Sequence, residues 1–93
     1  MKIAILGGTG ALGLGLASRW IRSGHEVLIG SRTIESAKSA CEKLNINEDQ
    51  GMLNVGAANQ AEIACLTVPF SFQLDILSEV KDALSGKILI DGT

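Results

Sequence analysis

The sequence contains no tyrosine, and its aromatic residues amount to two phenylalanines and one tryptophan in 93 residues. A core must therefore be built from Ile, Leu, Val and Ala, which is typical of buried parallel sheets. The chain has no block of basic residues and a formal net charge of −2, which argues against nucleic acid as a partner. Its apolar runs are far shorter than a membrane span, so no membrane partner is expected.

Cysteine is also scarce. The two cysteines, Cys41 and Cys65, lie in apolar contexts and lack the spacing of metal ligands. We therefore expect buried or half-buried thiols in a reducing compartment. The opening stretch "MKIAIL" reads as a strand and does not follow the plan of a signal peptide. Together these features predict a cytoplasmic protein and no metal site.

Apolar patterning predicts alternating strands and helices within one domain, residues 1–93. The expected strands cover 2–6, 25–30, 52–55, 63–68 and 87–90. Helical spacing is expected from Leu12 to Ile21, from Thr33 to Leu44, over 56–61, and from a cap at Ser71 through Leu84 to a stop at Gly86. This alternation predicts an α/β fold, a doubly wound, Rossmann-like parallel sheet with five strands in the order 3-2-1-4-5. In such sheets the ligand lies beside the switch point between strands one and four.

Five glycines fall within nine residues directly after the first strand, in "GGTGALGLG". Gly8, Gly10 and Gly13 satisfy G-x-G-x-x-G. In a dinucleotide site they would respectively form the turn, admit the pyrophosphate and allow close helix packing. The helix start would hold the phosphates through its N–H groups. A purely structural glycine turn is the alternative interpretation, and the absence of a following Lys-Ser/Thr excludes a P-loop.

A second glycine spacing is also present. Gly7, Gly10 and Gly13 fit the G-x-x-G-x-x-G of short-chain dehydrogenases. Those enzymes use a Tyr-x-x-x-Lys pair, and this chain has no tyrosine, so that chemistry is excluded for the chain by itself.

The end of the second strand, "VLIGSRT", predicts which dinucleotide is bound. An NAD site usually carries Asp or Glu at this point to hold the ribose 2′-hydroxyl. Here Ser31 and Arg32 stand instead. A guanidinium can pair with a 2′-phosphate and a hydroxyl can donate to it, whereas an acid would repel it. The sequence therefore favours NADP, with a solvent-exposed surface arginine as the alternative interpretation. The missing acid also argues against an S-adenosylmethionine methyltransferase.

The segment "TVPFSF" follows the fourth strand and is expected to border the nicotinamide half of the cofactor. Pro69 ends that strand and can shape the floor of the site. Phe70 and Phe72 could contact the cofactor or pack in the core, and the sequence leaves both open. No catalytic triad, carboxylate pair or metal cluster can be assembled, so no catalytic side chain is predicted.

With these motifs in place, the chain resembles the N-terminal NADP-binding domain of the NADPH-dependent reductases of the deazaflavin coenzyme F-420 (F420). The matching stretches are "KIAILGGTGALGLGLA", "GHEVLIGSR" and "LTVPF". The resemblance implies hydride transfer between NADPH and the deazaflavin, with the cofactors supplying the chemistry. It also implies that the pyrophosphate contacts Thr9, Gly10, Ala11 and Leu12, the 2′-phosphate contacts Ser31 and Arg32, and the nicotinamide lies near Val68 and Pro69.

The chain departs from the family pattern in two ways. Some relatives carry a basic residue four positions after the arginine, where this chain has Ser36. Family members also continue into a C-terminal region that helps to form the deazaflavin site and a dimer, whereas this chain stops at "ILIDGT". We therefore expect a truncated form, a natural fragment, or a module completed by a partner. The apolar fifth strand offers an edge for a homodimer or a completing partner.

Two functional hypotheses remain. In the first, the chain is the NADP-binding portion of an oxidoreductase that acts on coenzyme F420, although these 93 residues alone are expected to be inactive. In the second, the chain is a non-catalytic NADP(H)-binding module, or a fragment that needs a partner. A turnover assay with NADPH and the deazaflavin separates the two.

Overall fold

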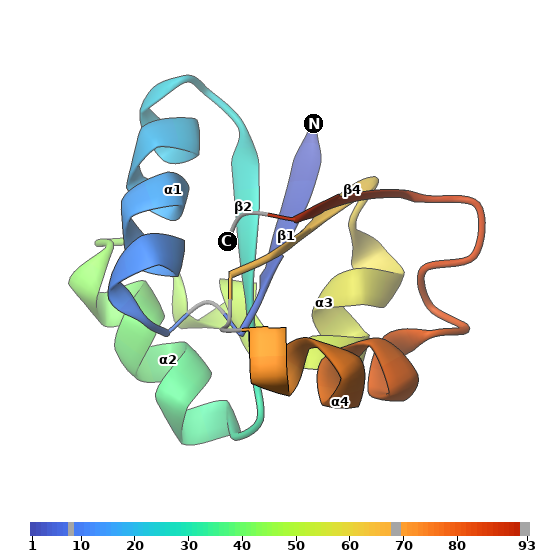
Figure 1. Cartoon of the computed structure of the whole chain (residues 1–93). Helices are drawn as coiled ribbons and strands as arrows, with labels where there is room; N and C mark the ends of the chain where they lie inside the picture. The colour runs from blue at the N-terminus through green and yellow to red at the C-terminus, as the bar shows by residue number, and fades with distance from the viewer. Residues whose placement is uncertain (8, 68–69, 92–93) are drawn as a thin grey trace.

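The computed structural model describes residues 1–7, 9–67 and 70–91. Figure 1 shows one sheet between two pairs of helices, with α1 and α2 on one face and α3 and α4 on the other. The elements follow one another as β1 (Lys2–Leu6), α1 (Ala11–Arg22), β2 (Glu26–Ser31), α2 (Ile34–Lys43), a 3₁₀ turn η1 (Glu48–Gln50), β3 (Gly51–Leu53), α3 (Asn54–Gln60), β4 (Ile63–Leu66), α4 (Phe70–Val80) and β5 (Ile88–Asp91).

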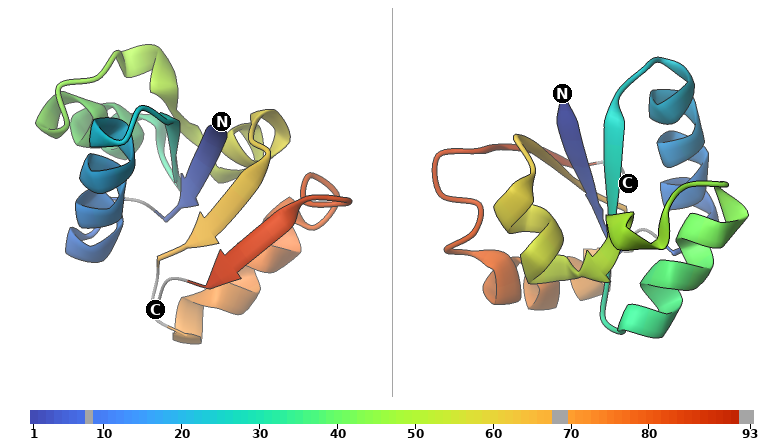
Figure 2. Two further views of the ribbon diagram at one scale, coloured as in Figure 1. Left: turned by 90° about the horizontal axis from the view of Figure 1, so that it is seen from above. Right: turned by 180° about the vertical axis from the view of Figure 1, so that it is seen from behind.

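The sheet has the order β3-β2-β1-β4-β5, and every neighbouring pair is parallel. The predicted doubly wound fold and its strand order are therefore confirmed. β1 lies at the centre, where Ile5 is paired with Ile29 of β2 and with Cys65 of β4. The two views of Figure 2 show the strands side by side with the helices stacked on both faces.

Alternate residues of the central strands point to opposite faces and build two cores. The core under α1 and α2 contains Ile5, Ala17, Val27, Ile29, Ala40 and Cys41. The core under α3 and α4 contains Ala4, Leu6, Leu28, Ala57, Ala58, Ala61, Ala64, Leu66, Ile76, Val80 and Ala83. Both are aliphatic, as the scarcity of aromatic residues predicts. Small alanines on the helices let these short elements lie close to the strands.

Both cysteines are buried, as predicted, and neither forms a disulfide. Burial raises the pKa of the Cys41 thiol, and the nearby carboxylate of Glu48 raises it further. Cys41 also lies against Gly51, where an added Cβ would meet the Ala37 carbonyl oxygen at 2.7 Å and the Cys41 sulfur at 3.0 Å. Glycine therefore starts β3 because α2 leaves no room for a side chain there.

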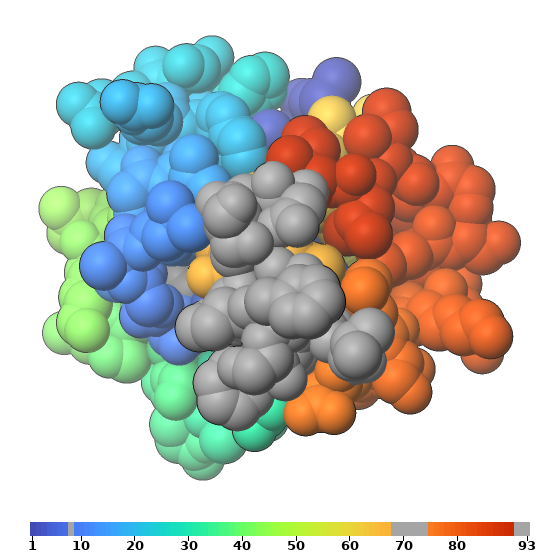
Figure 3. Space-filling view, viewed as in Figure 1, coloured from blue at the N-terminus to red at the C-terminus, as the bar shows by residue number. Residues whose placement is uncertain are grey.

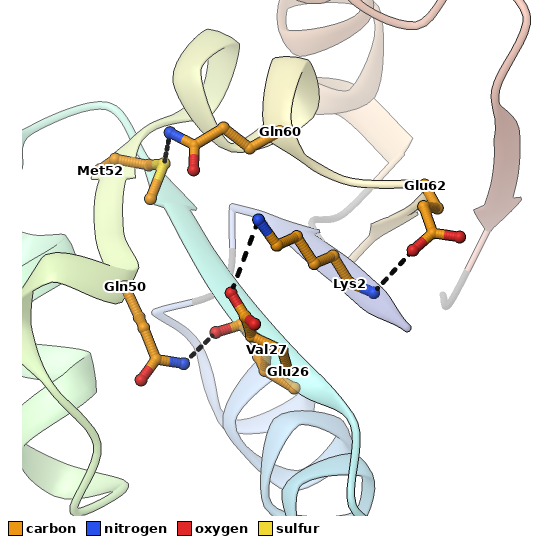
Figure 4. Close-up of polar contacts among 7 residues, drawn as sticks. All are labelled: Lys2, Glu26, Val27, Gln50, Met52, Gln60 and Glu62. Carbon is orange, nitrogen blue, oxygen red and sulfur yellow. Dashed lines mark hydrogen bonds and ion pairs between the residues drawn. The ribbon is translucent and has the colours of Figure 1, made fainter.

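Polar contacts hold the register at the amino-terminal ends of the strands (Figure 4). The Lys2 backbone N–H donates to a Glu62 carboxylate oxygen at 3.3 Å, and the Lys2 Nζ lies 3.9 Å from Glu26 Oε2. Beside them, the Gln50 side-chain amide donates to the Val27 carbonyl at 2.7 Å. This end of the sheet is opposite to the strand ends where ligands bind in such folds.

Two element boundaries near β3 differ from the sequence prediction. The strand expected over 52–55 covers Gly51–Leu53, and the helix expected over 56–61 covers Asn54–Gln60. Asn54 and Val55 therefore begin α3. The β-branched Val55 favoured a strand locally, but tertiary contacts of Asn54 start the helix at this point.

The boundaries around β4, α4 and β5 also differ. The strand expected over 63–68 ends at Leu66, with Val68 outside the described residues. The last helix runs from Phe70 to Val80, whereas a cap at Ser71 and an end near Leu84 were predicted. Residues 81–86 form turns directly after the helix. A backbone bond from the Leu84 N–H to the Val80 carbonyl connects these turns to the end of α4. β5 begins at Ile88, one residue later than predicted.

Within the part of the chain that the structure describes, no helix has the length and apolar character that crossing a bilayer requires.

Candidate functional site

The carboxyl ends of β1 and β4 form the switch point of the sheet. Gly7 follows β1 with a φ of +70°, a conformation that side chains disfavour, so the chain turns sharply there. Thr67 follows β4, and its backbone N–H donates to the Leu6 carbonyl at 3.3 Å. The buried Thr67 hydroxyl lies 3.2 Å from that oxygen and 3.3 Å from the Gly7 carbonyl oxygen, and it donates its proton between them. These bonds hold the two strand ends together at the crevice.

A cavity of about 320 Å³ opens at this edge of the sheet, at the lower end of the range for small-molecule sites. Its wall is built from the turn after β1, the loop after β2, the start of α3 and the middle of α4. The wall includes Gly7, Thr9, Ser31, Arg32, Asn54 and Ile76. In Figure 1 the loop between β2 and α2 lies at the lower end of the sheet, where α2 and α4 flank it.

Ser31 and Arg32 both line this cavity. Ser31 is the last residue of β2 and is 6% exposed, whereas the Arg32 side chain is 61% exposed. The Arg32 Nη2 lies 3.9 Å from the Oδ2 of Asp75 on α4. None of the described residues that line the cavity is acidic. The arrangement therefore presents hydroxyl groups and a guanidinium, which suit an anionic, oxygen-rich ligand.

The start of α1 adds backbone donors. Gly10 is the N-cap residue, and it forms no side-chain cap bond to the first turn. An added Cβ at Gly10 would meet nothing within 4 Å, so space is open above this turn. Thr9 is exposed at the cavity wall, and Gly13 is buried in the helix, as close packing on the strand requires.

Ala11 and Leu12 lie apart from this cavity. Both are exposed, and both line a separate depression of about 280 Å³ with Arg19 on the outer face of α1. Leu12, which starts the expected helical spacing, has an exposed fraction of 45%. Gly13 and Ala17 provide the buried contact instead.

Three predicted site residues, Gly8, Val68 and Pro69, lie outside the described residues. The side chains of Phe70 and Phe72, for which cofactor contacts were considered, also lie outside the described part of the structure. The structure therefore brings together the predicted residues of the glycine turn and of the β2 end, namely Thr9, Ser31 and Arg32.

Sequence reasoning missed Asn54 at this edge, and it included Thr67 only within the segment expected to border the nicotinamide, without a role of its own. Asn54 is fully buried, and its Oδ1 accepts a bond from the Gly7 N–H at 3.0 Å. No local pattern marks either residue, because each acts on a turn about fifty to sixty positions away in the chain. An amide directly after a short strand, at the ligand edge of a predicted sheet, is the signal that could have indicated Asn54.

Among the described residues, no group of three His, Cys, Asp or Glu side chains could hold a metal ion. The polar groups of the cavity are hydroxyls, one guanidinium and one amide.

The fold and the crevice define the chain as a Rossmann-like α/β domain with its ligand edge at the β1–β4 switch point. The family model described as "NADP oxidoreductase coenzyme F420-dependent" matches residues 2–93. The chain belongs to this family, and the resemblance noted from the sequence is confirmed.

Curated relatives of the chain are named F420-dependent NADP reductases. The F420-dependent NADP reductase of Methanothermobacter marburgensis is 52% identical over 99 residues, which cover all of this chain and 44% of the relative. The F420-dependent NADP reductase of Methanocaldococcus jannaschii is 38% identical over 98 residues, which cover 97% of this chain and 44% of the relative. The chain spans less than half the length of the curated relatives it matches.

Solved structures show the same fold. A candidate F420-dependent NADP reductase from Arthrobacter sp. FB24 superposes with a TM-score of 0.81 at 27% identity, over 98% of this chain and 44% of that one. An imine reductase from Streptomyces aurantiacus superposes with a TM-score of 0.73 at 20% identity, over 98% of this chain and 31% of that one. The second likeness concerns the fold alone.

Proposed function

We propose that this chain is the NADP(H)-binding part of an oxidoreductase that transfers hydride between NADPH and the deazaflavin coenzyme F420. One observation carries the proposal. Ser31 ends β2 and Arg32 follows it at the cavity wall, where an NAD site would carry a carboxylate, and none of the described lining residues is acidic. The names of the curated relatives support the same dinucleotide and the same deazaflavin.

In this proposal, Arg32 pairs with the 2′-phosphate and Ser31 donates to it. Gly8, Thr9, Gly10, Ala11, Leu12 and Gly13 form the pyrophosphate turn. The space at Gly10, where an added Cβ would meet no described atom beyond its chain neighbours within 4 Å, and the lack of a side-chain cap there support that placement. Val68 and Pro69 are assigned to the nicotinamide side. The bound nicotinamide supplies the hydride chemistry, and this chain's residues bind and orient it.

The fold supports the assignment of residues 1–93 to one domain. Both cores use the sheet as their shared layer, and no composition break divides the chain. We also place the protein in the cytoplasm, which two buried cysteines outside any disulfide support.

The outer edge of β5 is the proposed surface for association with a second copy of the chain. β5 ends the sheet order, and Ile88, Leu89 and Ile90 are 61%, 42% and 40% exposed. Figure 3 shows this segment, in red, at the molecular surface. An exposed apolar edge strand favours pairing with another strand.

Calorimetric titration of the chain with NADPH and, separately, with NADH tests the dinucleotide assignment. We expect NADPH to bind at least tenfold more tightly than NADH. Comparable affinities would contradict the 2′-phosphate site, and no binding of either would contradict a dinucleotide function.

A turnover assay with NADPH and coenzyme F420 tests the hydride transfer. The reaction oxidises NADPH as the deazaflavin is reduced. A rate above background assigns catalysis to the chain itself. Tight NADPH binding without turnover agrees with both hypotheses, because these 93 residues alone are expected to be inactive; only a rate above background excludes a module without catalysis.

A further inference from the structure

Asn54 occupies an unusual place for an amide side chain. It is the first residue of α3, directly after β3, and its exposed fraction is 0%. Its Oδ1 accepts a bond of 3.0 Å from the Gly7 N–H, across 47 positions of the chain. The bond ties the start of α3 to the glycine turn after β1. Asn54 therefore fixes the turn on which the proposed pyrophosphate site depends.

Asn54 is also packed tightly against Gly30 of β2. A Cβ added at Gly30 would lie 2.7 Å from the Asn54 Oδ1 and 3.1 Å from the Asn54 Cα. Glycine is therefore required at the penultimate position of β2 for Asn54 to fit. The side chain thus lies between the carboxyl ends of β1 and β2, and this packing holds it in place.

The nitrogen of the same amide is unpaired. Asn54 Nδ2 is buried and has no hydrogen-bond partner among the described residues. Buried polar atoms in folded proteins nearly always have a partner, because an unpaired donor loses its bonds to water. The fixed acceptor bond to Gly7 also settles which atom of the amide is the nitrogen.

Asn54 belongs to the wall of the cavity that Ser31 and Arg32 line. A ligand seated there would bring acceptor oxygens toward a donor that the protein has already desolvated and oriented. The described part of the cavity wall offers a guanidinium and hydroxyl groups beside it, and these also favour an oxygen-rich anion.

We propose that Asn54 is a binding residue for the adenosine half of the dinucleotide. Its Nδ2 donates to an oxygen of the ribose or of the 2′-phosphate, while its Oδ1 holds the glycine turn. One amide thereby couples the shape of the pyrophosphate turn to occupancy of the ribose site. The inference rests on the proposed function, because it presumes that the cavity holds a dinucleotide.

Substitution Asn54→Asp tests the donor. The variant keeps an oxygen for the Gly7 N–H and replaces the NH₂ group with an acceptor. Asn59→Asp is the matched control, since Asn59 lies on the same helix and is exposed. We expect Asn54→Asp to raise the dissociation constant for NADPH at least tenfold and Asn59→Asp to change it less than twofold. A loss for NADH, which lacks the 2′-phosphate that a carboxylate would repel, assigns the ribose as acceptor, and a loss confined to NADPH is judged by NMR titration of the unsubstituted chain, where no charge is introduced.

A second measurement does not depend on the variant folding. The side-chain NH₂ signals of Asn54 in the unsubstituted chain are followed by ¹⁵N NMR during titration with adenosine 2′,5′-bisphosphate. We expect them to shift at saturation and their hydrogen exchange to slow. If the bisphosphate binds and these signals do not move, or if a folded Asn54→Asp variant binds NADPH as tightly as the parent, the inference is wrong while the proposed function stands. If the parent chain binds no dinucleotide, the proposed function fails first.

Discussion

The Nη2 atom of Arg32 lies 3.9 Å from the Oδ2 atom of Asp75, so α4 places a carboxylate beside the guanidinium at the cavity. Both side chains are largely exposed, at 61% and 74%. Ion pairs of this kind contribute about 0–1 kcal/mol, so an incoming phosphate can displace the carboxylate. The pair connects the loop after β2 to α4 across the cavity. Arg32 and Asp75 can therefore be substituted separately to test each partner.

Arg32→Ala should weaken NADPH binding about tenfold and NADH binding less than about threefold, because a charge-assisted bond to a 2′-phosphate is lost. Titration calorimetry of both dinucleotides measures the difference. Arg22→Ala, at the far end of α1, is the control and should change neither affinity. Equal losses for NADPH and NADH would refute the assignment of Arg32 to the 2′-phosphate.

Asp75→Asn should strengthen NADPH binding about two- to fivefold, because the competing carboxylate is removed from Arg32. The gain should shrink as salt rises, since exposed charges are screened. Glu79→Gln, an exposed acid one turn further along α4, is the matched control. A gain of the same size from Glu79→Gln would indicate a general effect of net charge and contradict a direct competition.

Gly10→Ala should weaken NADPH binding at least tenfold while the free energy of unfolding falls by less than about 1 kcal/mol. The added methyl group meets no protein atom within 4 Å, so its cost falls on the ligand that approaches this turn. Gly15→Ala, which also meets nothing within 4 Å, should raise helix stability by about 1 kcal/mol and leave binding unchanged. Unchanged NADPH affinity in Gly10→Ala would argue against a pyrophosphate at this turn.

Gly51→Ala should destabilise the fold by roughly 1–3 kcal/mol, because its methyl group would overlap the Ala37 carbonyl of α2. Urea unfolding followed by circular dichroism measures the change. Gly56→Ala serves as the control, since its Cβ would meet the Met52 side chain at an ordinary 3.6 Å. Equal stabilities of the two variants would show that α2 moves away from β3 at little cost.

Leu89→Lys should reduce self-association of the chain through the β5 edge, because a charged side chain on an edge strand opposes pairing with a second copy. Sedimentation velocity over a concentration series measures the monomer fraction of parent and variant. Lys38→Leu, on the exposed surface of α2, changes hydrophobicity elsewhere and should leave the β5 contact intact. A parent that stays monomeric at all concentrations would contradict association through this edge.

Much of this architecture could be predicted from local pattern. The alternation of apolar strands and amphipathic helices determines a doubly wound parallel sheet, and right-handed crossovers leave few other topologies. The place of Ser31 and Arg32 at the carboxyl end of β2 could also be predicted, and their contact with a 2′-phosphate stays a prediction. Their lining of one cavity agrees with that position.

The parts that escaped prediction depend on contacts between distant residues. Asn54 was placed in the strand expected over 52–55, yet it begins α3 and accepts a bond from the distant Gly7 N–H. The positive φ of Gly7 was not predicted either. Gly8, to which the turn was assigned, lies outside the described residues, so that assignment stays a prediction. The end of α4 at Val80 was missed because the apolar spacing continues through Leu84, although the backbone has already turned.

The central position of β1 has a consequence for the order in which the crevice forms during synthesis. β1 is made first, and it can pair with β2 as soon as α1 and β2 have emerged. The Thr67 hydroxyl that joins it to the other side reaches back 61 positions to the Leu6 carbonyl. Closing such a long loop is slow relative to local pairing. Ser31 and Arg32 are therefore in place at the end of β2 before β4 and Thr67 complete the crevice. Until Thr67 arrives, the glycine turn is held from one side only.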